Sequence, residues 1–200
     1  LFESNCFLDA LKSGLYRDDK IDFFYKKKVA DSYAYLEVCV KEGDIVCDGG
    51  ALFYDDNEDF IKHALERNAS KVVAFEPHPK SFAKIVEVYG ENSKVAVKNA
   101  ALGSEQGSLY LSNNVENNAS CNASGVGERI DALTIDSVFL DSGLDFLKLD
   151  IEGFEMEALK GAVESIKKYK PKLAICLYHK LNDPYDIPTF IKSLVPEYKM

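Results

Sequence analysis

The sequence lacks the marks of a membrane-spanning or exported protein. It contains no apolar run close to the ~20 residues that a membrane-spanning helix needs. Its first 20 residues, LFESNCFLDALKSGLYRDDK, have neither the basic nor the apolar region of a signal peptide. We therefore expect a protein without a membrane span, located in the cytoplasm.

The sequence also lacks closely spaced cysteine pairs and an excess of basic residues. The five cysteines include no CxxC pair, which argues against a disulfide framework or a zinc site and favours reduced, mostly buried thiols. Lys and Arg number 24 against 33 Asp and Glu, so the formal net charge is -9 and nucleic acids or anionic membranes would be repelled. We therefore expect neither nucleic acid nor an anionic membrane as a partner, and the oligomeric state stays open.

The 200 residues, 46% of them apolar, suffice for one compact unit with its own core. Residues 1–40 mix apolar and charged positions in a helical pattern and are predicted to form an N-terminal helical cap on a main domain at 41–200. In that domain, short Val-, Ile- and Leu-rich runs alternate with amphipathic stretches, which is typical of strands and helices in turn. The alternation predicts an α/β fold, a Rossmann-like parallel sheet with helices on both faces. The predicted strands are 44–48, 71–76, 94–99, 145–150 and 172–178, and the predicted helices are 57–67, 79–89, 153–168 and 186–195.

Residues 105–136 depart from this alternation. The runs GSLYL and ERIDALTI are predicted to be additional strands, and the polar stretch SNNVENNASCNASGVG between them is predicted to be a loop.

A turn of small residues, Gly49, Gly50 and Ala51, follows the first predicted strand and precedes a group of acidic residues. In an open parallel sheet, ligands bind at the carboxyl ends of the strands, and small residues let the backbone approach them closely. The spacing is not GxGxxG, and carboxylates would oppose a pyrophosphate. S-adenosylmethionine, which carries a sulfonium and an ammonium, fits better. Two plainer explanations stay open, a tight turn for the glycines and helix capping for the acids.

The second predicted strand ends at Glu76 and Pro77. A carboxylate at this position can accept hydrogen bonds from both ribose hydroxyls of an adenosine. Glu76 is therefore a candidate for cofactor binding, although an ordinary surface glutamate would have the same sequence context.

Several stretches resemble the FkbM-type methyltransferases, a branch of the S-adenosylmethionine-dependent class. The resemblance runs from about residue 40 to 195 and implies a Rossmann-like fold of the class I methyltransferase type. The matching stretches are VKEGDIVCDGGA, VVAFEPHPKSFAKI, VKNAALGSEQGSLYL, LTIDSVF and DFLKLDIEGFEMEALKGAVESIKKYKPKLAICLYHK.

The resemblance implies roles for particular residues. It places the cofactor motif at Asp48, Gly49, Gly50 and Ala51, and the ribose acid at Glu76, next to Pro77. It also implies that a turn near the adenine is formed by Asn99, Ala100 and Ala101.

Two departures from the family pattern stand out. Tyr54 occupies a position where a second glycine is usual, so cofactor contact there is expected to be rearranged or weakened. The chain stops at VPEYKM, where the family continues through the final two sheet strands. We therefore expect a sheet without those strands or a chain that continues beyond this point.

Asp150, Glu152 and His179 are the candidate catalytic residues. Asp150 and Glu152 match the D-x-E-G step of the family, and their spacing would place both side chains on one side of an extended chain. His179 matches a histidine after the fifth strand. It is the first choice for the base that takes the proton of a hydroxyl acceptor, and Asp150 is the second. A divalent ion held by the three side chains is the alternative, but we expect no metal.

The sequence therefore predicts an S-adenosylmethionine-dependent methyltransferase. The resemblance implies O-methylation of a sugar, a glycan precursor or another small polar metabolite. Two alternatives stay open, an NAD-type oxidoreductase on a similar fold and a noncatalytic, degenerate methyltransferase relative.

Overall fold

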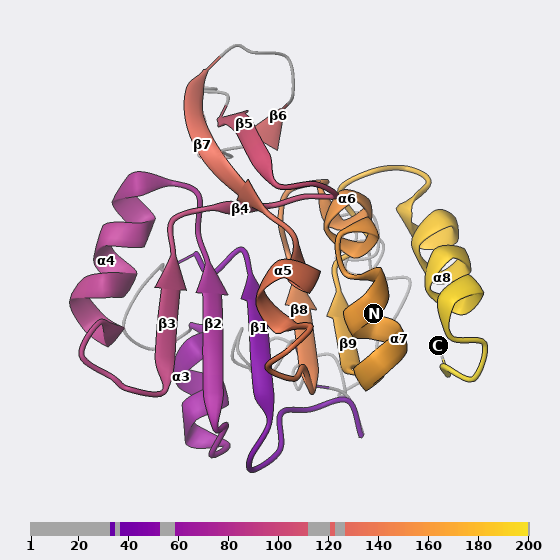
Figure 1. The fold of residues 1–200 in the computed structure, drawn as a ribbon, viewed down its shortest axis with the longest axis horizontal. Helices are drawn as coiled ribbons and strands as arrows, with labels where there is room; N and C mark the ends of the chain where they lie inside the picture. The colour runs from indigo at the N-terminus through magenta and orange to yellow at the C-terminus, as the bar shows by residue number, and fades with distance from the viewer. Residues whose placement is uncertain (1–32, 35–36, 53–58, 112–120, 123–126, 200) are drawn as a thin grey trace, which may run out of the picture.

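The computed structural model describes residues 33–34, 37–52, 59–111, 121–122 and 127–199. Its centre is a five-stranded parallel sheet with the strand order β3-β2-β1-β8-β9 (Figure 1). The strand order reverses between β1 and β8, because β2 and β3 lie on one side of β1 and the later strands on the other. The strands are β1 (Ile45–Gly49), β2 (Lys71–Phe75), β3 (Val95–Lys98), β8 (Phe146–Leu149) and β9 (Lys172–Ile175). All five predicted strands are confirmed.

Helices cover both faces of the sheet, as predicted. Successive residues of β1 point to opposite faces: Val46 packs in one buried cluster and Cys47 in the other. The cluster around Val46 is closed by α3 (Phe60–Glu66) and α4 (Pro79–Tyr89). The cluster around Cys47 is closed by α5 (Ile135–Phe139), α6 (Glu155–Lys160), α7 (Val163–Tyr169) and α8 (Asp183–Leu194).

The single helix predicted over 153–168 is two helices, α6 and α7, separated at Gly161 and Ala162. A Cβ at Gly161 would lie 2.1 Å from the carbonyl oxygen of Gly103, and the Gly161 carbonyl accepts a hydrogen bond from the Asp136 N–H at 2.8 Å. The break is made by this close backbone approach. The helical spacing of the apolar residues continues through the break, so the sequence pattern predicts one helix and not two.

A second, four-stranded sheet has the order β4-β7-β5-β6 and stands over the carboxyl ends of the main sheet (Figure 1). The predicted strand ERIDALTI ends at Leu133, because Thr134 caps α5 and its hydroxyl accepts the Ser137 N–H at 3.1 Å. The predicted polar loop lies mostly outside the described residues. The strands are β4 (Ala101–Leu102), β5 (Gly107–Leu111), β6 (Cys121–Asn122) and β7 (Glu128–Leu133).

Most of the predicted N-terminal cap lies outside the described residues. Residues 37–40 form a turn and a β-bridge, so the predicted helical character does not extend to residue 40. The division into a cap and a main domain stays a prediction. Among the helices of the described residues, none combines the length and the apolar character that crossing a membrane requires.

Candidate active site

The turn after β1 depends on glycine at position 50. Gly50 has a φ of +76°, and a Cβ there would lie 2.0 Å from the carbonyl oxygen of Asp150. The N–H groups of Gly50 and Ala51 both donate to the Phe75 carbonyl at 3.1 Å. The predicted turn therefore lies at the carboxyl ends of β1, β2 and β8, next to the point where the strand order reverses.

Lys148, in β8, lies directly beneath this turn. Its ammonium donates to the carbonyl oxygens of Gly50 at 2.7 Å and Gly49 at 3.2 Å, and it pairs with the Asp48 carboxylate at 2.9 Å. Burial by itself lowers the pKa of Lys148, because it disfavours the charged ammonium. The negative charges of Asp48 and Asp150 outweigh this effect, so the pKa of Lys148 is raised. We did not predict this role from the sequence. The available signal was a lysine inside the apolar run DFLKLD.

Glu76, Pro77 and Asn99 gather at the carboxyl ends of β2 and β3. The Asn99 side-chain amide donates to the carbonyl oxygens of Glu76 at 2.9 Å and Pro77 at 3.1 Å. Glu76 is buried, its Oε1 accepts the His78 N–H at 2.7 Å, and burial raises its pKa to about 7. Glu76 is therefore held in place but is only partly ionised at neutral pH.

Ala100 and Ala101 are both buried, and Ala101 belongs to β4. Contact of these two residues with an adenine stays a prediction. Tyr54, the residue at the departure from the family pattern, lies outside the described residues.

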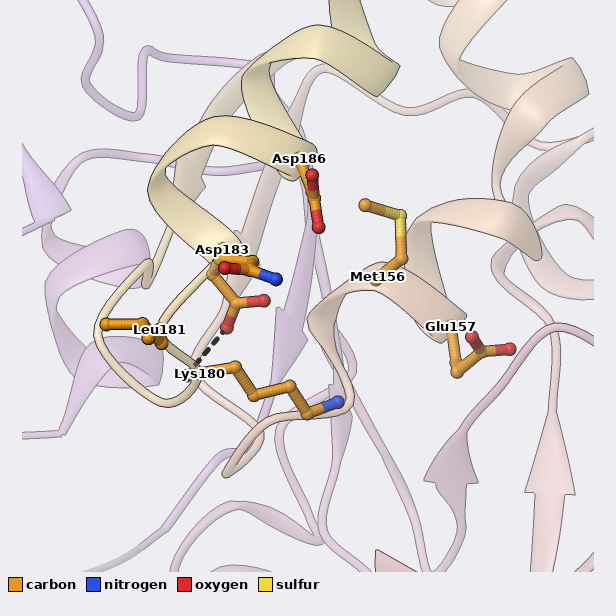
Figure 2. A pocket seen from close by; sticks show the side chains of 7 residues that line it. Met156, Glu157, Lys180, Leu181, Asp183 and Asp186 are labelled. Atoms are coloured by element: carbon orange, nitrogen blue, oxygen red, sulfur yellow. Dashed lines mark hydrogen bonds between the residues drawn. The ribbon is translucent and has the colours of Figure 1, made fainter.

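A cavity of 330 Å³ lies between α6 and the start of α8, beyond the end of β9 (Figure 2). The Asp183 carboxylate is buried at its edge and accepts the Lys180 N–H at 3.0 Å. Charged and apolar side chains both line the cavity. The lining residues are Met156, Glu157, Lys180, Leu181, Asn182, Asp183 and Asp186.

Asp150 follows β8 and is held by two tyrosine hydroxyls. Tyr33 donates to Oδ2 at 2.7 Å and Tyr178 donates to Oδ1 at 2.8 Å. Burial alone would raise the pKa of Asp150, but Lys148 and the two hydroxyls outweigh it and hold the pKa below its usual range. Asp150 is thus a fixed, ionised carboxylate next to the glycine turn.

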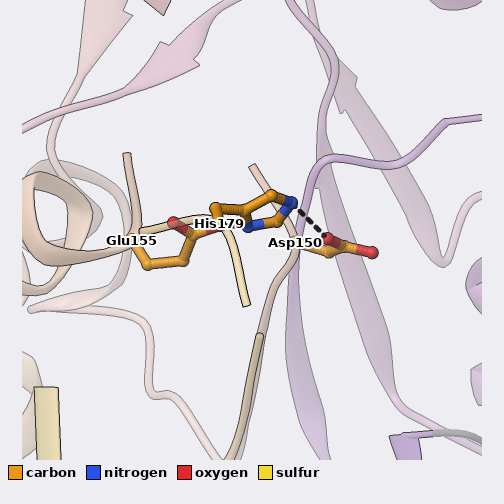
Figure 3. Close-up of side chains that lie close together, drawn as sticks. All are labelled: Asp150, Glu155 and His179. Atoms are coloured by element: carbon orange, nitrogen blue, oxygen red, sulfur yellow. Dashed lines mark ion pairs between the residues drawn. The ribbon is translucent and has the colours of Figure 1, made fainter. Parts of the chain in front are cut away.

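His179 lies among three carboxylates, of which Figure 3 shows Asp150 and Glu155. Its Nε2 is 3.6 Å from both Asp150 Oδ1 and Glu152 Oε2, and its Nδ1 is 2.9 Å from Glu155 Oε1. Burial by itself lowers the pKa of His179, but Glu155, followed by Glu152 and Asp150, outweighs it and the pKa is raised. The structure thus brings the three predicted catalytic residues together.

The path by which Glu152 reaches this cluster differs from the prediction. The chain is not extended after Asp150, because Glu152 has a φ of +54° and Gly153 a φ of +93°. This left-handed turn carries the Glu152 carboxylate to His179. Glu155, which was not among the predicted site residues, also belongs to the cluster, and its side chain is 0% exposed.

A model of the FkbM methyltransferase domain family matches residues 47–197, well over half of the chain. The chain belongs to the FkbM methyltransferase family. The matched residues of this FkbM family member include the turn after β1, Lys148 and the cluster around His179.

A solved structure supports the fold of this FkbM family member. The crystal structure of methyltransferase FkbM from Methylobacillus flagellatus KT matches it with a TM-score of 0.66 and 23% sequence identity. The match covers 86% of this chain but 43% of that chain, so the sequence spans less than half the length of this neighbour. No curated protein matches the chain.

The cluster around His179 also has the residue types of a metal site. Ligand atoms of Asp150, Glu155 and His179 lie within 4.8 Å of one another, so these residues of the FkbM family member could hold a divalent ion. The metal site considered from the sequence consisted of Asp150, Glu152 and His179. The set in the structure has Glu155 in place of Glu152.

Proposed function

We propose that this FkbM family member is an S-adenosylmethionine-dependent methyltransferase that acts on a hydroxyl group of a small polar metabolite, a sugar being the favoured class. One observation carries the proposal. The glycine turn after β1 and the Glu76 carboxylate after β2 lie at the carboxyl edge next to the point where the strand order reverses, the usual place for a ligand in this architecture.

The cofactor assignment follows from the groups at this edge. Gly50 would let the backbone approach the ligand, and the Glu76 carboxylate is proposed to accept the ribose hydroxyls. Asp48 and Asp150 add negative charge, of which the Lys148 ammonium neutralises part. A ligand with a sulfonium and an ammonium suits such surroundings better than a pyrophosphate does.

The start of α3 argues further against a dinucleotide. Asp59 caps this helix: its Oδ1 accepts the Lys62 N–H at 2.7 Å, and its Oδ2 accepts the Tyr89 hydroxyl at 2.6 Å. In a dinucleotide-binding fold, the pyrophosphate binds at the N-terminus of the helix that follows β1. In this protein the Asp59 carboxylate already occupies the N-terminus of α3. The acidic residue closest to α3 therefore acts as a helix cap.

The transfer joins an acceptor oxygen to the methyl carbon while the carbon–sulfur bond breaks and its electron pair goes to sulfur. The hydroxyl proton has to leave, and a positioned base contributes about 10²- to 10⁴-fold. His179 is the first choice, because the raised pKa of its imidazole makes it a stronger base than Asp150, whose pKa is lowered. Glu152 is proposed to add negative charge beside the reacting atoms.

Calorimetry with S-adenosylmethionine, S-adenosylhomocysteine and NAD tests the cofactor. Binding of the first two alone supports the proposal, and binding of NAD alone would support an oxidoreductase. No binding would support a noncatalytic relative. Glu76→Gln should weaken the binding of S-adenosylmethionine by about 1 to 3 kcal/mol, because hydrogen bonds to a charged carboxylate are lost. Glu164→Gln, at an exposed residue of α7, is the matched control.

The acceptor is tested by incubating metabolite extracts and defined sugars with labelled S-adenosylmethionine. Label recovered in an O-methyl sugar supports the sugar class, and label in another hydroxyl compound supports O-methylation alone. His179→Gln should abolish most of the labelling and leave cofactor affinity within about threefold. Equal labelling by this variant would remove His179 as the base.

A further inference from the structure

Glu155 and the other two carboxylates contact different nitrogens of the His179 ring. Glu155 lies at Nδ1, whereas Asp150 and Glu152 lie at Nε2. Figure 3 shows Glu155 and Asp150 on opposite sides of the ring. The two ring nitrogens of a neutral histidine have different roles, since one carries the proton and the other can accept one. The arrangement of the carboxylates therefore decides which nitrogen is free to act as a base.

Glu155 is fixed more firmly than an ordinary helix-surface glutamate. It lies in the first turn of α6, its side chain is 0% exposed, and its Oε1 accepts the Ile151 N–H at 2.9 Å. Its Oε2 is buried without a hydrogen-bond partner among the described residues. A buried carboxylate oxygen without a partner is unfavourable for stability. Packing alone therefore does not explain a glutamate at this position.

The contact between Glu155 and His179 is short but not yet well aligned. Nδ1 and Oε1 are 2.9 Å apart, a hydrogen-bonding distance, while their directions are off line, so Nδ1 makes no regular hydrogen bond among the described residues. Catalytic hydrogen bonds are often poorly aligned without substrate and tighten when it binds.

Distances and burial favour a proton on Nδ1. The contacts of Nε2 are longer, at 3.6 Å each, and its partners are more accessible to water, since the Glu152 side chain is 42% exposed and that of Asp150 is 23% exposed. Asp150 also already accepts two tyrosine hydroxyls. Water and these hydroxyls weaken the hold on a proton at Nε2. Glu155 also has a donor, the Ile151 N–H on its Oε1, but it is shielded from water and 2.9 Å from Nδ1, so it holds a proton at Nδ1 more strongly.

We propose that Glu155 is a positioning residue that holds His179 with its proton on Nδ1 and leaves Nε2 to take the proton of the acceptor hydroxyl. This role rests on the proposed methyl transfer, in which the proton moves from the acceptor oxygen to Nε2 and Glu155 stabilises the resulting imidazolium. The groups that face or adjoin His179 are Glu155 of α6, Asp150 and Glu152 after β8, Asp183 of α8, and the neighbouring Tyr178 and Lys180.

Nitrogen NMR of the cofactor-free protein tests the tautomer directly. The chain has three histidines, so the His179 resonances are assigned from their loss in His179→Gln. EDTA in the buffer removes divalent ions. At a pH above its pKa, His179 should carry its proton on Nδ1 and show an unprotonated Nε2. A neutral ring protonated on Nε2 would overturn the proposal.

Glu155→Gln tests the role of the carboxylate. The amide keeps the size of the side chain and removes its charge, so the pKa of His179 should fall and the Nε2-protonated tautomer should increase. Glu164→Gln, the control on α7, should change neither. Unchanged tautomer and pKa in Glu155→Gln would contradict the proposal. If this variant does not fold, the tautomer of His179 in the unmodified protein decides whether the proposal holds.

Kinetics then separate a positioning role from a purely structural one. Glu155→Gln should lower kcat by about 10²-fold or more, while KM for the cofactor changes by less than about threefold. Thermal unfolding of the same variant controls for loss of structure. The NMR result does not depend on methyl transfer, so a chain that binds no S-adenosylmethionine would overturn the proposed function while the tautomer still decides the proposal for Glu155.

Discussion

Lys148 and Asp48 form a buried ion pair, 2.9 Å long, directly under the turn that is the candidate cofactor site. Both side chains are almost fully buried, and Lys148 also donates to the carbonyl oxygens of Gly49 and Gly50. The pair connects β1 to β8 at the point where the strand order reverses, so the shape of the turn depends on a residue 98 positions later in the chain.

Replacing Lys148 should therefore destabilise the protein strongly. Lys148→Met leaves the Asp48 carboxylate buried without its counter-charge, and breaking such a pair costs about 3 to 5 kcal/mol. Urea unfolding measures the loss. Lys167→Met, which breaks the exposed pair with Glu164, should change the free energy of unfolding by less than about 1 kcal/mol.

The double variant Asp48→Asn, Lys148→Met should recover part of that loss, because neither residue of the pair then carries a buried charge. A double variant no more stable than Lys148→Met would mean that the carbonyl contacts of Lys148, and not its pairing with Asp48, hold the turn.

Gly50→Ala should disrupt the turn itself. An alanine at position 50 would have to adopt a φ of +76°, and its Cβ would lie 2.0 Å from the Asp150 carbonyl oxygen. We expect a loss of about 2 kcal/mol or more in the free energy of unfolding and a large loss of cofactor affinity. Gly107→Ala is the matched control, since nothing lies within 4 Å of the added Cβ and the φ of Gly107 is not positive. Equal effects of the two substitutions would refute the argument.

Glu76 should make folding stability depend on pH. Its pKa is about 7 in the folded protein against a reference value of 4.5, so the folded state holds the proton more tightly. Its stabilising contribution is fully present below pH 4.5 and is lost as the pH rises through about 7, with a total of about 3 kcal/mol. Comparison with Glu76→Gln across this range isolates the effect. Parallel stability curves for the two proteins would exclude it.

Cofactor affinity should follow the opposite trend with pH. The ionised Glu76 carboxylate is the better acceptor for ribose hydroxyls, and with a pKa of about 7 its ionised fraction rises from about a tenth at pH 6 to about nine-tenths at pH 8. The Kd for S-adenosylmethionine should therefore fall by up to about tenfold between these pH values. Glu76→Gln should lose this dependence. The same pH dependence in the variant would place its origin elsewhere.

Most elements of the fold were predictable from local patterns. The runs DIVCD, KVVAFE, KVAVKN, DFLKLD and KLAICLY are apolar and bounded by turns, and the strands formed within a residue or two of each run, apart from the last, which ends earlier. The break at Gly161 was missed, since it is made by backbone 58 residues away at Gly103 and leaves the apolar spacing intact. Such a contact has no local signal.

The sequence by itself determined the strand and helix alternation, the glycine at position 50 and the acidic and imidazole residue types at the strand ends. These follow from spacing and from the chemistry of single residues. Only the tertiary structure decided which of these groups meet: Lys148 under the turn, Glu152 carried to His179 by a left-handed turn, and Glu155 turned inward against Nδ1. Burial and pairing depend on contacts between distant segments, and they determine how each charge behaves.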